Sequence, residues 1–379
     1  MLDSALQVPE EDRLGSAEDL DRIVDADAQV QETPEALLEH MDESSGAHRV
    51  ISLTELRHDM IYAGPSSYPL YEYKRTNGGG ERVAVDDVDD AIGATELADR
   101  ARAAGIDAGV VNPTLNLGLA EVNNDRFAVA LASAYNDWLL AQLDDCPSLV
   151  GNAVVAPQHP TRAAEEIDRL ADEDDIVGVQ LPASGLLPPP GHRQYEPIYD
   201  AADSHDLPIA MKSTVGNKSF GQQYWWAQSF PEDFVYQHGF VQMRNLTSIL
   251  FEGIPEKYDV DFVVQGAGIG FVPSFTHRLD DHYLELGYEI PALTQLPSAY
   301  LSESFYWTTQ PMNQPPQGDP QFAAMVNMIG PENVLFGSDL PHGISDLPET
   351  VVDRLAESVT AEELGAIMAD NVERVYGLS

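Results

Sequence analysis

The sequence has a single cysteine and no long apolar run, and each of these features excludes a class of structure. Cys146 is the only cysteine among 379 residues, so an internal disulfide and a cysteine-rich zinc cluster are both excluded. No run approaches the roughly 18 apolar residues that a membrane-spanning helix needs. The acidic N-terminus, "MLDSALQVPEEDRLGSAEDLD", has no basic region followed by an apolar core, so it does not read as a secretory signal. We therefore expect a cytoplasmic protein with no membrane partner.

Basic residues are scarce as well. Lys and Arg total 20 against 63 Asp and Glu, which gives a formal net charge of −43. Because 43% of the residues are hydrophobic, the chain is not a disordered acidic polymer. A surface of this charge would repel the phosphates of nucleic acid, so we expect no nucleic-acid partner. It indicates adaptation to high salt, where screening weakens the repulsion between carboxylates.

The same charge predicts that folding depends on salt. Repulsion among the surplus carboxylates destabilises the compact state, and added salt screens it. The midpoint of thermal unfolding should therefore rise with KCl concentration. A midpoint that stays constant across the KCl series would contradict the high-salt interpretation.

Apolar runs alternate with helical patterns along the chain, which predicts βα units and a parallel sheet. We expect eight strands: Ile23–Val30, Ile106–Asn112, Leu149–Pro157, Ile176–Pro182, Pro208–Ser213, Val260–Gln265, Glu303–Thr308 and Val334–Asp339. Apolar residues at three- and four-residue spacing predict helices between most of them: Asp86–Ala104, Asp125–Leu143, Thr161–Ala171, Tyr195–Ser204 and Pro348–Glu357. Eight such units predict a (β/α)8 barrel. The main alternative is a doubly wound open sheet, but no G-x-G-x-x-G follows an early strand.

Two segments exceed a minimal barrel. Residues 1–22 read as a mobile acidic arm, and residues 23–379 are expected to form the barrel. Residues 31–105 are too long for one βα loop. They include "PSSYPLYEYKRTNGGGER", a tyrosine-rich stretch with a glycine tip. We interpret it as an excursion over the barrel mouth, with a solvated loop of no function as the alternative.

Polar side chains gather where a barrel of this kind carries its active site, at the C-terminal ends of the strands. Predicted strand one offers Asp25, Asp27 and Gln29, and predicted strands five, six and eight end in Lys212, Gln265 and Asp339. The first three alternate along "IVDADAQV" and so are expected on one face. His238 and His342 flank the predicted mouth and are candidates for proton transfer.

A series of blocks resembles the amidohydrolase-related family, which includes aminocarboxymuconate-semialdehyde decarboxylase and related hydrolases. The blocks run in order from residue 23 to 379 and include "IVDADAQVQETPEALLEHMDE", "YEPIYDAADSHDLPIAMKS", "NLTSILFEGIPEKYDVDFVVQGAGIGFVPSFTHRLDDHY", "PENVLFGSDLPH" and "IMADNVERVYGL". Each block alone is weak, but together they are specific. The resemblance implies a barrel that hydrolyses or decarboxylates a small carboxylated or aromatic compound.

The resemblance also implies a divalent metal such as zinc, and here the sequence departs from the family. Members usually carry Asp-x-His-x-His on strand one, where this chain reads "DADAQ" from Asp25 to Gln29. Lys212 replaces the histidine ligand of strand five, and Gln265 replaces a strand-six histidine that often acts as acid or base. Zinc takes about four ligands, mostly imidazole, thiolate or carboxylate. Only Asp27 and Asp339 remain as candidates, so we expect no metal cofactor.

Lys212 is the residue that most needs an explanation, because it lies in an apolar strand and is one of only four lysines. An unpaired ammonium there would be costly, or its pKa would fall. In one interpretation it fills the place of the metal and neutralises Asp27 and Asp339. In another it is a Schiff-base nucleophile or general base. Carbamylation to bridge two metals is a third, which the missing histidines disfavour.

Three functional hypotheses remain open. The first is a hydrolase or decarboxylase that uses Asp339, Lys212 and His238 as catalytic residues, with Asp27, Gln29, Gln265 and His342 in binding roles. The second is a lyase that forms an imine on Lys212. The third is a barrel that has lost catalysis and keeps a binding role. A small-molecule substrate is expected in the first two, and a homo-oligomer is compatible with all three.

Overall fold

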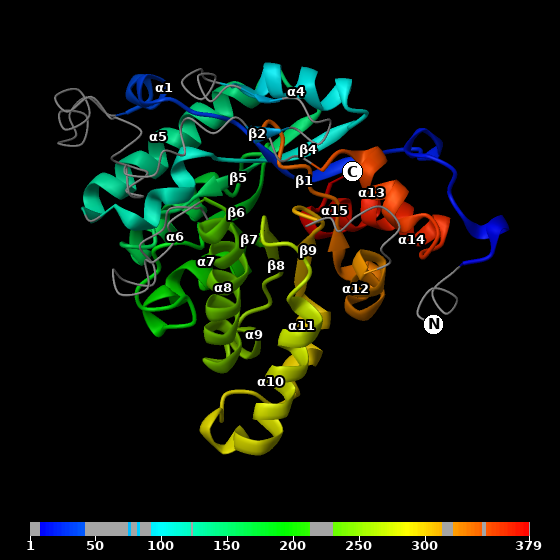
Figure 1. The fold of residues 1–379 in the computed structure, drawn as a ribbon. Coiled ribbons are helices and arrows are strands. Elements are labelled where there is room, and N and C mark those ends of the chain that lie inside the picture. Colours follow the sequence, from blue (N-terminus) through cyan, green and yellow to red (C-terminus); the bar gives the residue numbers. More distant parts are fainter. Residues whose placement is uncertain are drawn as a thin grey trace.

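The structure, a computed structural model, describes residues 8–41, 75–76, 82–83, 92–122, 124–212, 230–312, 321–342 and 346–378. Its centre is an eight-stranded sheet in the order β1-β4-β5-β6-β7-β8-β9-β10, with neighbouring strands parallel (Figure 1). The strands are β1 Val24–Gln29, β4 Ala108–Asn112, β5 Leu149–Val154, β6 Ile176–Pro182, β7 Ile209–Lys212, β8 Phe262–Gln265, β9 Phe305–Thr308 and β10 Val334–Leu335. Two further short strands, β2 Arg75–Thr76 and β3 Arg82–Val83, pair antiparallel.

Backbone hydrogen bonds close the sheet on itself. The amide of Ala26 donates to Phe336 O at 2.9 Å, and the amide of Asp339 donates to Asp27 O at 3.0 Å. These bonds join the chain just beyond β10 to the first strand. The predicted (β/α)8 barrel is therefore confirmed, with all eight strands in the predicted places.

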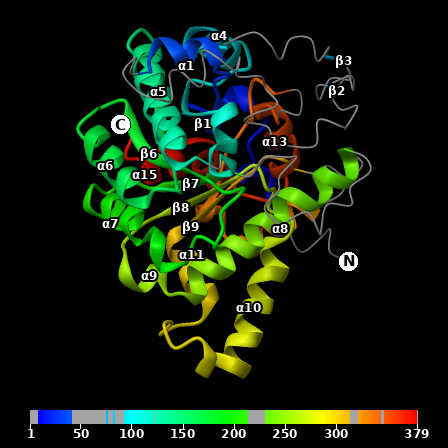
Figure 2. The ribbon, with the colours of Figure 1, turned by 90° about the vertical axis from the view of Figure 1, so that its left-hand side faces the viewer.

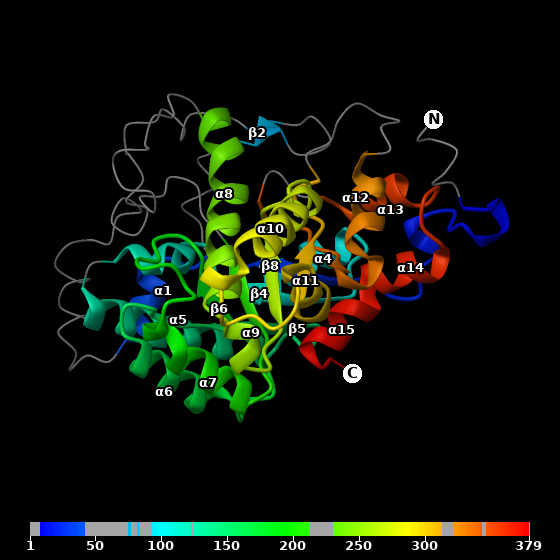
Figure 3. The same cartoon turned by 90° about the horizontal axis from the view of Figure 1, so that it is seen from below.

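Helices cover the outside of the barrel (Figure 2). They are α1 Pro34–Glu39, α4 Ala94–Ala103, α5 Asp125–Leu143, α6 Pro160–Leu170, α7 Glu196–Ser204, α8 Phe230–Phe251, α9 Ile254–Lys257, α10 Val272–Leu286, α11 Pro297–Ser304, α12 Gln321–Ile329, α13 Pro348–Leu355, α14 Ala361–Gly365 and α15 Asn371–Tyr376. Helices α12 to α15 lie on one side of the barrel and α5 to α7 on the other (Figure 3). The predicted helix over Asp125–Leu143 is confirmed at both ends.

Strand alternation places neighbouring residues of one strand in different apolar clusters. Phe262 of β8 and Phe305 of β9 belong to the large cluster that includes the helices, and their rings stack at 4.9 Å. The next residue of each strand, Val263 and Tyr306, points the opposite way and packs with Tyr376 of α15. Each such buried large side chain stabilises the fold by roughly 1.5–3 kcal/mol. The strand ends that carry the polar residues are thus held between two packed layers.

The segments outside the minimal barrel are only partly described. Residues 8–22 lie against α13: the amide of Val8 donates to Glu357 O at 3.0 Å, and that of Ala17 donates to Glu349 Oε2 at 3.2 Å. The mobility expected for residues 1–22 stays a prediction. Most of "PSSYPLYEYKRTNGGGER" lies outside the described residues, so its expected course over the mouth also stays a prediction.

Helices α10 and α11 project away from the barrel as an arm, which is plain in two perpendicular views (Figures 1 and 2). Leu284 and Tyr288 near its tip are 74% and 76% exposed. Among the helices of the described residues, none is long and apolar enough to cross a membrane.

Candidate functional site

Lys212 ends β7, and its ammonium binds two carboxylates. Its Nζ lies 2.8 and 2.9 Å from Asp27 Oδ1 and Oδ2, and 2.5 Å from Asp339 Oδ1. Lys212 is 5% exposed and Asp27 is fully buried. The ion pairs expected from the sequence are therefore present. They tie together the ends of β1 and β7 and the chain that follows β10.

Two features of the backbone aim the acids at the lysine. The register of β1 against β4 shifts between Asp25 and Ala28, which marks a bulge. Before the bulge, the carboxylate of Asp25 accepts from the amide of Ser338 at 2.9 Å and also binds the Ser338 hydroxyl. The single face expected for Asp25, Asp27 and Gln29 is thus interrupted, and the carboxylate of Asp25 also accepts from the amide of Asp27 at 2.9 Å.

The second feature is the conformation of Asp339, whose φ is +61°. A non-glycine residue adopts this left-handed region rarely, and Asp and Asn tolerate it better than most.

Gly266, just after the end of β8, has a φ of +64°, and a Cβ there would come within 2.9 Å of Lys212 Cε. The lysine stem therefore lies against a backbone position that only glycine fits without displacement.

The charges of the cluster are coupled by burial. Burial raises the pKa of Asp27, and the Lys212 ammonium opposes that rise because it favours the charged carboxylate. Burial by itself would lower the pKa of Lys212, but the carboxylates of Asp27 and Asp339 outweigh it and raise that pKa. Lys212 is therefore an ammonium at neutral pH.

Amide side chains extend the cluster toward the mouth. Gln29 Nε2 donates to Asp339 Oδ1 at 2.7 Å, and Gln310 Nε2 donates to Asp339 Oδ2 at 3.2 Å. Gln29 Oε1 lies 2.6 Å from His342 Nε2. Because an amide oxygen only accepts, His342 Nε2 must carry a hydrogen at this contact. The structure therefore brings Gln29 and His342, both predicted for the site, into one hydrogen-bonded chain with Asp339.

The outcome differs for two other residues predicted for the site, Gln265 and His238. Gln265 pairs with Lys212 in the register of β7 and β8, but its Nε2 donates to Ala26 O at 2.8 Å rather than to a carboxylate. Its buried Oε1 accepts no hydrogen bond from the residues that the structure describes. His238 lies on α8, and its side chain lies outside the part of the chain that the structure describes. Its catalytic role stays a prediction.

Sequence reasoning missed several residues of the site. Gln310 comes two residues after the end of β9, so its place just beyond a strand end was a usable signal. Asp346 accepts from the amide of Met312 at 2.8 Å, and burial, assisted by Asp339, raises its pKa to about 6. Thr114 lies in the loop after β4, and Glu32 lies in the loop after β1. Strand periodicity does not predict where the side chains of loop residues point.

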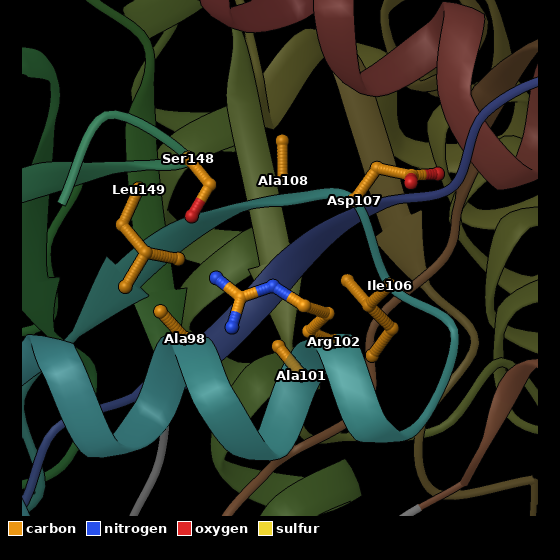
Figure 4. A pocket seen from close by; sticks show the side chains of 8 residues that line it. All are labelled: Ala98, Ala101, Arg102, Ile106, Asp107, Ala108, Ser148 and Leu149. Carbon is orange, nitrogen blue, oxygen red and sulfur yellow. The ribbon is translucent and has the colours of Figure 1, made fainter.

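Other features lie away from this cluster. A pocket of about 220 Å³ lies at the opposite end of the barrel, between α4 and the starts of β4 and β5 (Figure 4). Its charged lining residues are Arg102 and Asp107, and Arg102 pairs with Asp99 at 2.7 Å. Within the described ranges, the one group of histidine and acidic residues close enough to share an ion is Asp281, His282 and Glu285, exposed on α10.

Comparison with known proteins identifies the family of the chain. The model of a family described as amidohydrolase matches residues 26–378. The structure of 5-carboxyvanillate decarboxylase from Sphingomonas paucimobilis is 17% identical with a TM-score of 0.68, over 94% of this chain and 99% of that one. The same enzyme from Novosphingobium aromaticivorans, complexed with manganese and 4-hydroxy-3-methoxy-5-nitrobenzoic acid, is 20% identical with a TM-score of 0.68, over 98% and 99%.

An amidohydrolase from Mycobacterium avium subsp. paratuberculosis is 17% identical with a TM-score of 0.70, over 94% of this chain and 98% of that one. No curated protein sequence matches the chain. At these identities the solved structures establish a shared fold along nearly the whole chain.

Proposed function

Because the chain belongs to the amidohydrolase family, we propose that it is a hydrolase or decarboxylase of a small carboxylated or aromatic compound, with a lysine in place of the family's metal ion. One observation carries the proposal: the Asp27–Lys212–Asp339 cluster at the C-terminal end of the strands. In barrels of this kind that end carries the active site. The cluster is also the point at which the sequence departs most from the family.

Decarboxylation of an aromatic acid is the favoured reaction. Structures of 5-carboxyvanillate and 2,6-dihydroxybenzoate decarboxylases share the fold over most of both chains. In such a reaction the bond from the ring to the carboxylate breaks, CO2 leaves, and the ring carbon keeps the electron pair and takes up a proton. Hydrolysis of an ester or amide is the other reaction of the family and needs a water molecule in addition.

The donor set at the cluster does not suit a divalent metal. An ion that bridged Asp27 and Asp339 would need the space that Lys212 Nζ occupies, 2.5–2.9 Å from three carboxylate oxygens. An ammonium has no lone pair to offer and repels a cation. The nearby Gln29 amide is a weak ligand, because its Oε1 already faces His342. We therefore propose that the lysine supplies the positive charge that a metal supplies in relatives.

Asp339 is the member of the cluster that a substrate can reach. Its side chain is 14% exposed, whereas that of Asp27 is fully buried and that of Lys212 is 6% exposed. We assign it the proton transfer of either reaction: as a carboxylate it takes a proton from the attacking water, and in decarboxylation it first takes up a proton from solvent and then gives it to the ring carbon. Lys212 holds its carboxylate in place and offsets its charge.

A Lys212 imine is less well supported. A Schiff base needs a free amine as nucleophile. The carboxylates of Asp27 and Asp339 favour the charged form instead and, although burial opposes them, raise the pKa of Lys212. Its Nζ is also fully engaged by three carboxylate oxygens.

The proposal is tested with a panel of hydroxybenzoic acids and matched benzoate esters and amides, assayed in KCl with and without EDTA. Release of CO2 and the products identified by mass spectrometry distinguish decarboxylation from hydrolysis. We expect turnover of at least one compound, unchanged by EDTA. Asp339→Asn should abolish it while keeping the left-handed backbone, which Asn tolerates. Asp107→Asn, at the opposite end of the barrel, should leave it unchanged.

Three outcomes would contradict the proposal. Turnover that appears only after a divalent metal is added would restore a metal site. Reductive trapping of a carbonyl compound on Lys212 with borohydride would favour the lyase. Absence of turnover across the panel would favour a barrel that only binds.

A further inference from the structure

Glu32, three residues beyond the end of β1, is a buried carboxylate that none of the ion pairs of the site uses. It is 1% exposed. Its Oε2 accepts from the amide of Thr114 at 3.0 Å, and its Oε1 accepts from the amide and the side chain of Asn116 at 2.7 and 3.0 Å. These three donors compensate the lost hydration only in part, since burial still raises the pKa of Glu32. A costly buried acid thus fixes the start of the loop after β4.

The loop that Glu32 fixes delivers a hydroxyl to the candidate site. Thr114 Oγ1 donates to Val30 O at 2.7 Å. The same oxygen lies 3.3 Å from His342 Nε2 and 3.3 Å from Gln29 Oε1. Because His342 Nε2 carries a hydrogen, the hydroxyl faces it as an acceptor, whichever of Val30 O and Gln29 Oε1 takes the hydroxyl hydrogen. Two acceptors, Thr114 Oγ1 and Gln29 Oε1, therefore converge on the same ring nitrogen.

We propose that Glu32 is a positioning residue, which holds Thr114 so that His342 keeps its hydrogen on Nε2 and Gln29 keeps its amide nitrogen on Asp339. The chain of contacts runs from Glu32 through Thr114 to His342 and Gln29, and from Gln29 to Asp339 and Lys212. If Glu32 stabilised only the loop after β4, its replacement would leave the tautomer of His342 unchanged. The inference rests on the proposed function only where a reaction rate is measured.

The first test measures the tautomer of His342 directly and needs no substrate. Protein labelled with 15N-histidine is examined by NMR near pH 8, where an ordinary imidazole is neutral. The His342 signals, identified by their loss in His342→Gln, should report hydrogen on Nε2. His40 is an internal reference of the opposite kind, because its Nδ1 lies 3.0 Å from Ala36 O and must donate there.

Variants then separate positioning from stability. Glu32→Gln places an amide N–H against backbone donors, and Thr114→Val removes the hydroxyl while keeping its shape. Each should shift the His342 nitrogen signals toward a mixture of tautomers and leave those of His40 unchanged. Thr114→Ser, which restores the hydroxyl, should restore the native signals. Asp107→Asn is the matched control: Asp107 also accepts a backbone amide, that of Ile23 at 2.8 Å, but at the far end of the barrel.

Where turnover is found, Glu32→Gln should lower kcat by on the order of 100-fold, the effect of a displacement near 1 Å, with a smaller change in KM. The inference is overturned if the His342 signals in Glu32→Gln and Thr114→Val match the wild type, or if Asp107→Asn changes them equally. Because these signals are independent of turnover, a failed substrate panel would contradict the proposed reaction and leave this inference to be judged by NMR.

Discussion

Replacing Lys212 with methionine should lower the free energy of unfolding by about 3–5 kcal/mol. The change leaves two carboxylates, Asp27 and Asp339, facing each other without a cation, one fully buried and the other 14% exposed at its side chain. Their mutual repulsion and lost hydration both oppose folding. Urea unfolding of the purified variant in KCl measures the loss.

Two companion variants make this result specific. Lys212→Met combined with Asp339→Asn removes one of the stranded charges and should recover part of the loss. Lys257→Met breaks a surface pair with Glu196, 2.8 Å long and with side chains 46% and 36% exposed. Such a pair contributes about 0–1 kcal/mol, so this variant should be almost neutral. If Lys212→Met is as stable as Lys257→Met, the lysine is not neutralising the acids.

Replacing Asp346 with asparagine should stabilise the protein at neutral pH. Burial raises the pKa of Asp346 from 3.8 to about 6. The folded state therefore favours the protonated acid, and the wild type loses stability as pH rises from about 4 to 6. At about 1.4 kcal/mol per pKa unit the full cost is about 3 kcal/mol. Asparagine escapes this cost and still offers an oxygen to the amide of Met312.

The gain from Asp346→Asn should depend on pH in one direction. It should be largest above pH 6 and vanish below about pH 4, where the acid is protonated in both states. Unfolding free energies measured across this range provide the test. A gain that persists unchanged at pH 4 would mean that ionisation of Asp346 is not its cause.

The barrel and its charged cluster could be predicted because they depend on strand periodicity. The alternation in β7 and β8 places Lys212 and Gln265 at adjacent strand ends, and the register of the two strands pairs them. The scarcity of lysine gave a second signal, because a lysine in an apolar strand of a lysine-poor protein needs a carboxylate partner. Asp27 and Asp339 are the strand-end acids that such a lysine can reach.

The rest of the site depends on local geometry that alternation does not encode. The bulge between Asp25 and Ala28 shifts the register of β1, and no residue in that strand predicts it. Thr114 and Glu32 meet across 82 residues of sequence, through backbone amides whose direction is set by the loop. Gln310 and Asp346 reach the cluster from turns beyond β9 and β10. Such contacts follow from the closed barrel, which must be known first.

The direct test of the account is the metal content of the protein purified without added metal. Elemental analysis by mass spectrometry, after dialysis against a chelator-free KCl buffer and again after exposure to Mn²⁺ and Zn²⁺, counts the ions per chain. With Lys212 between Asp27 and Asp339, we predict far less than one tightly held divalent ion in either case. Close to one equivalent of zinc or manganese that survives dialysis and is lost in Asp339→Asn would contradict the replacement of the metal by Lys212.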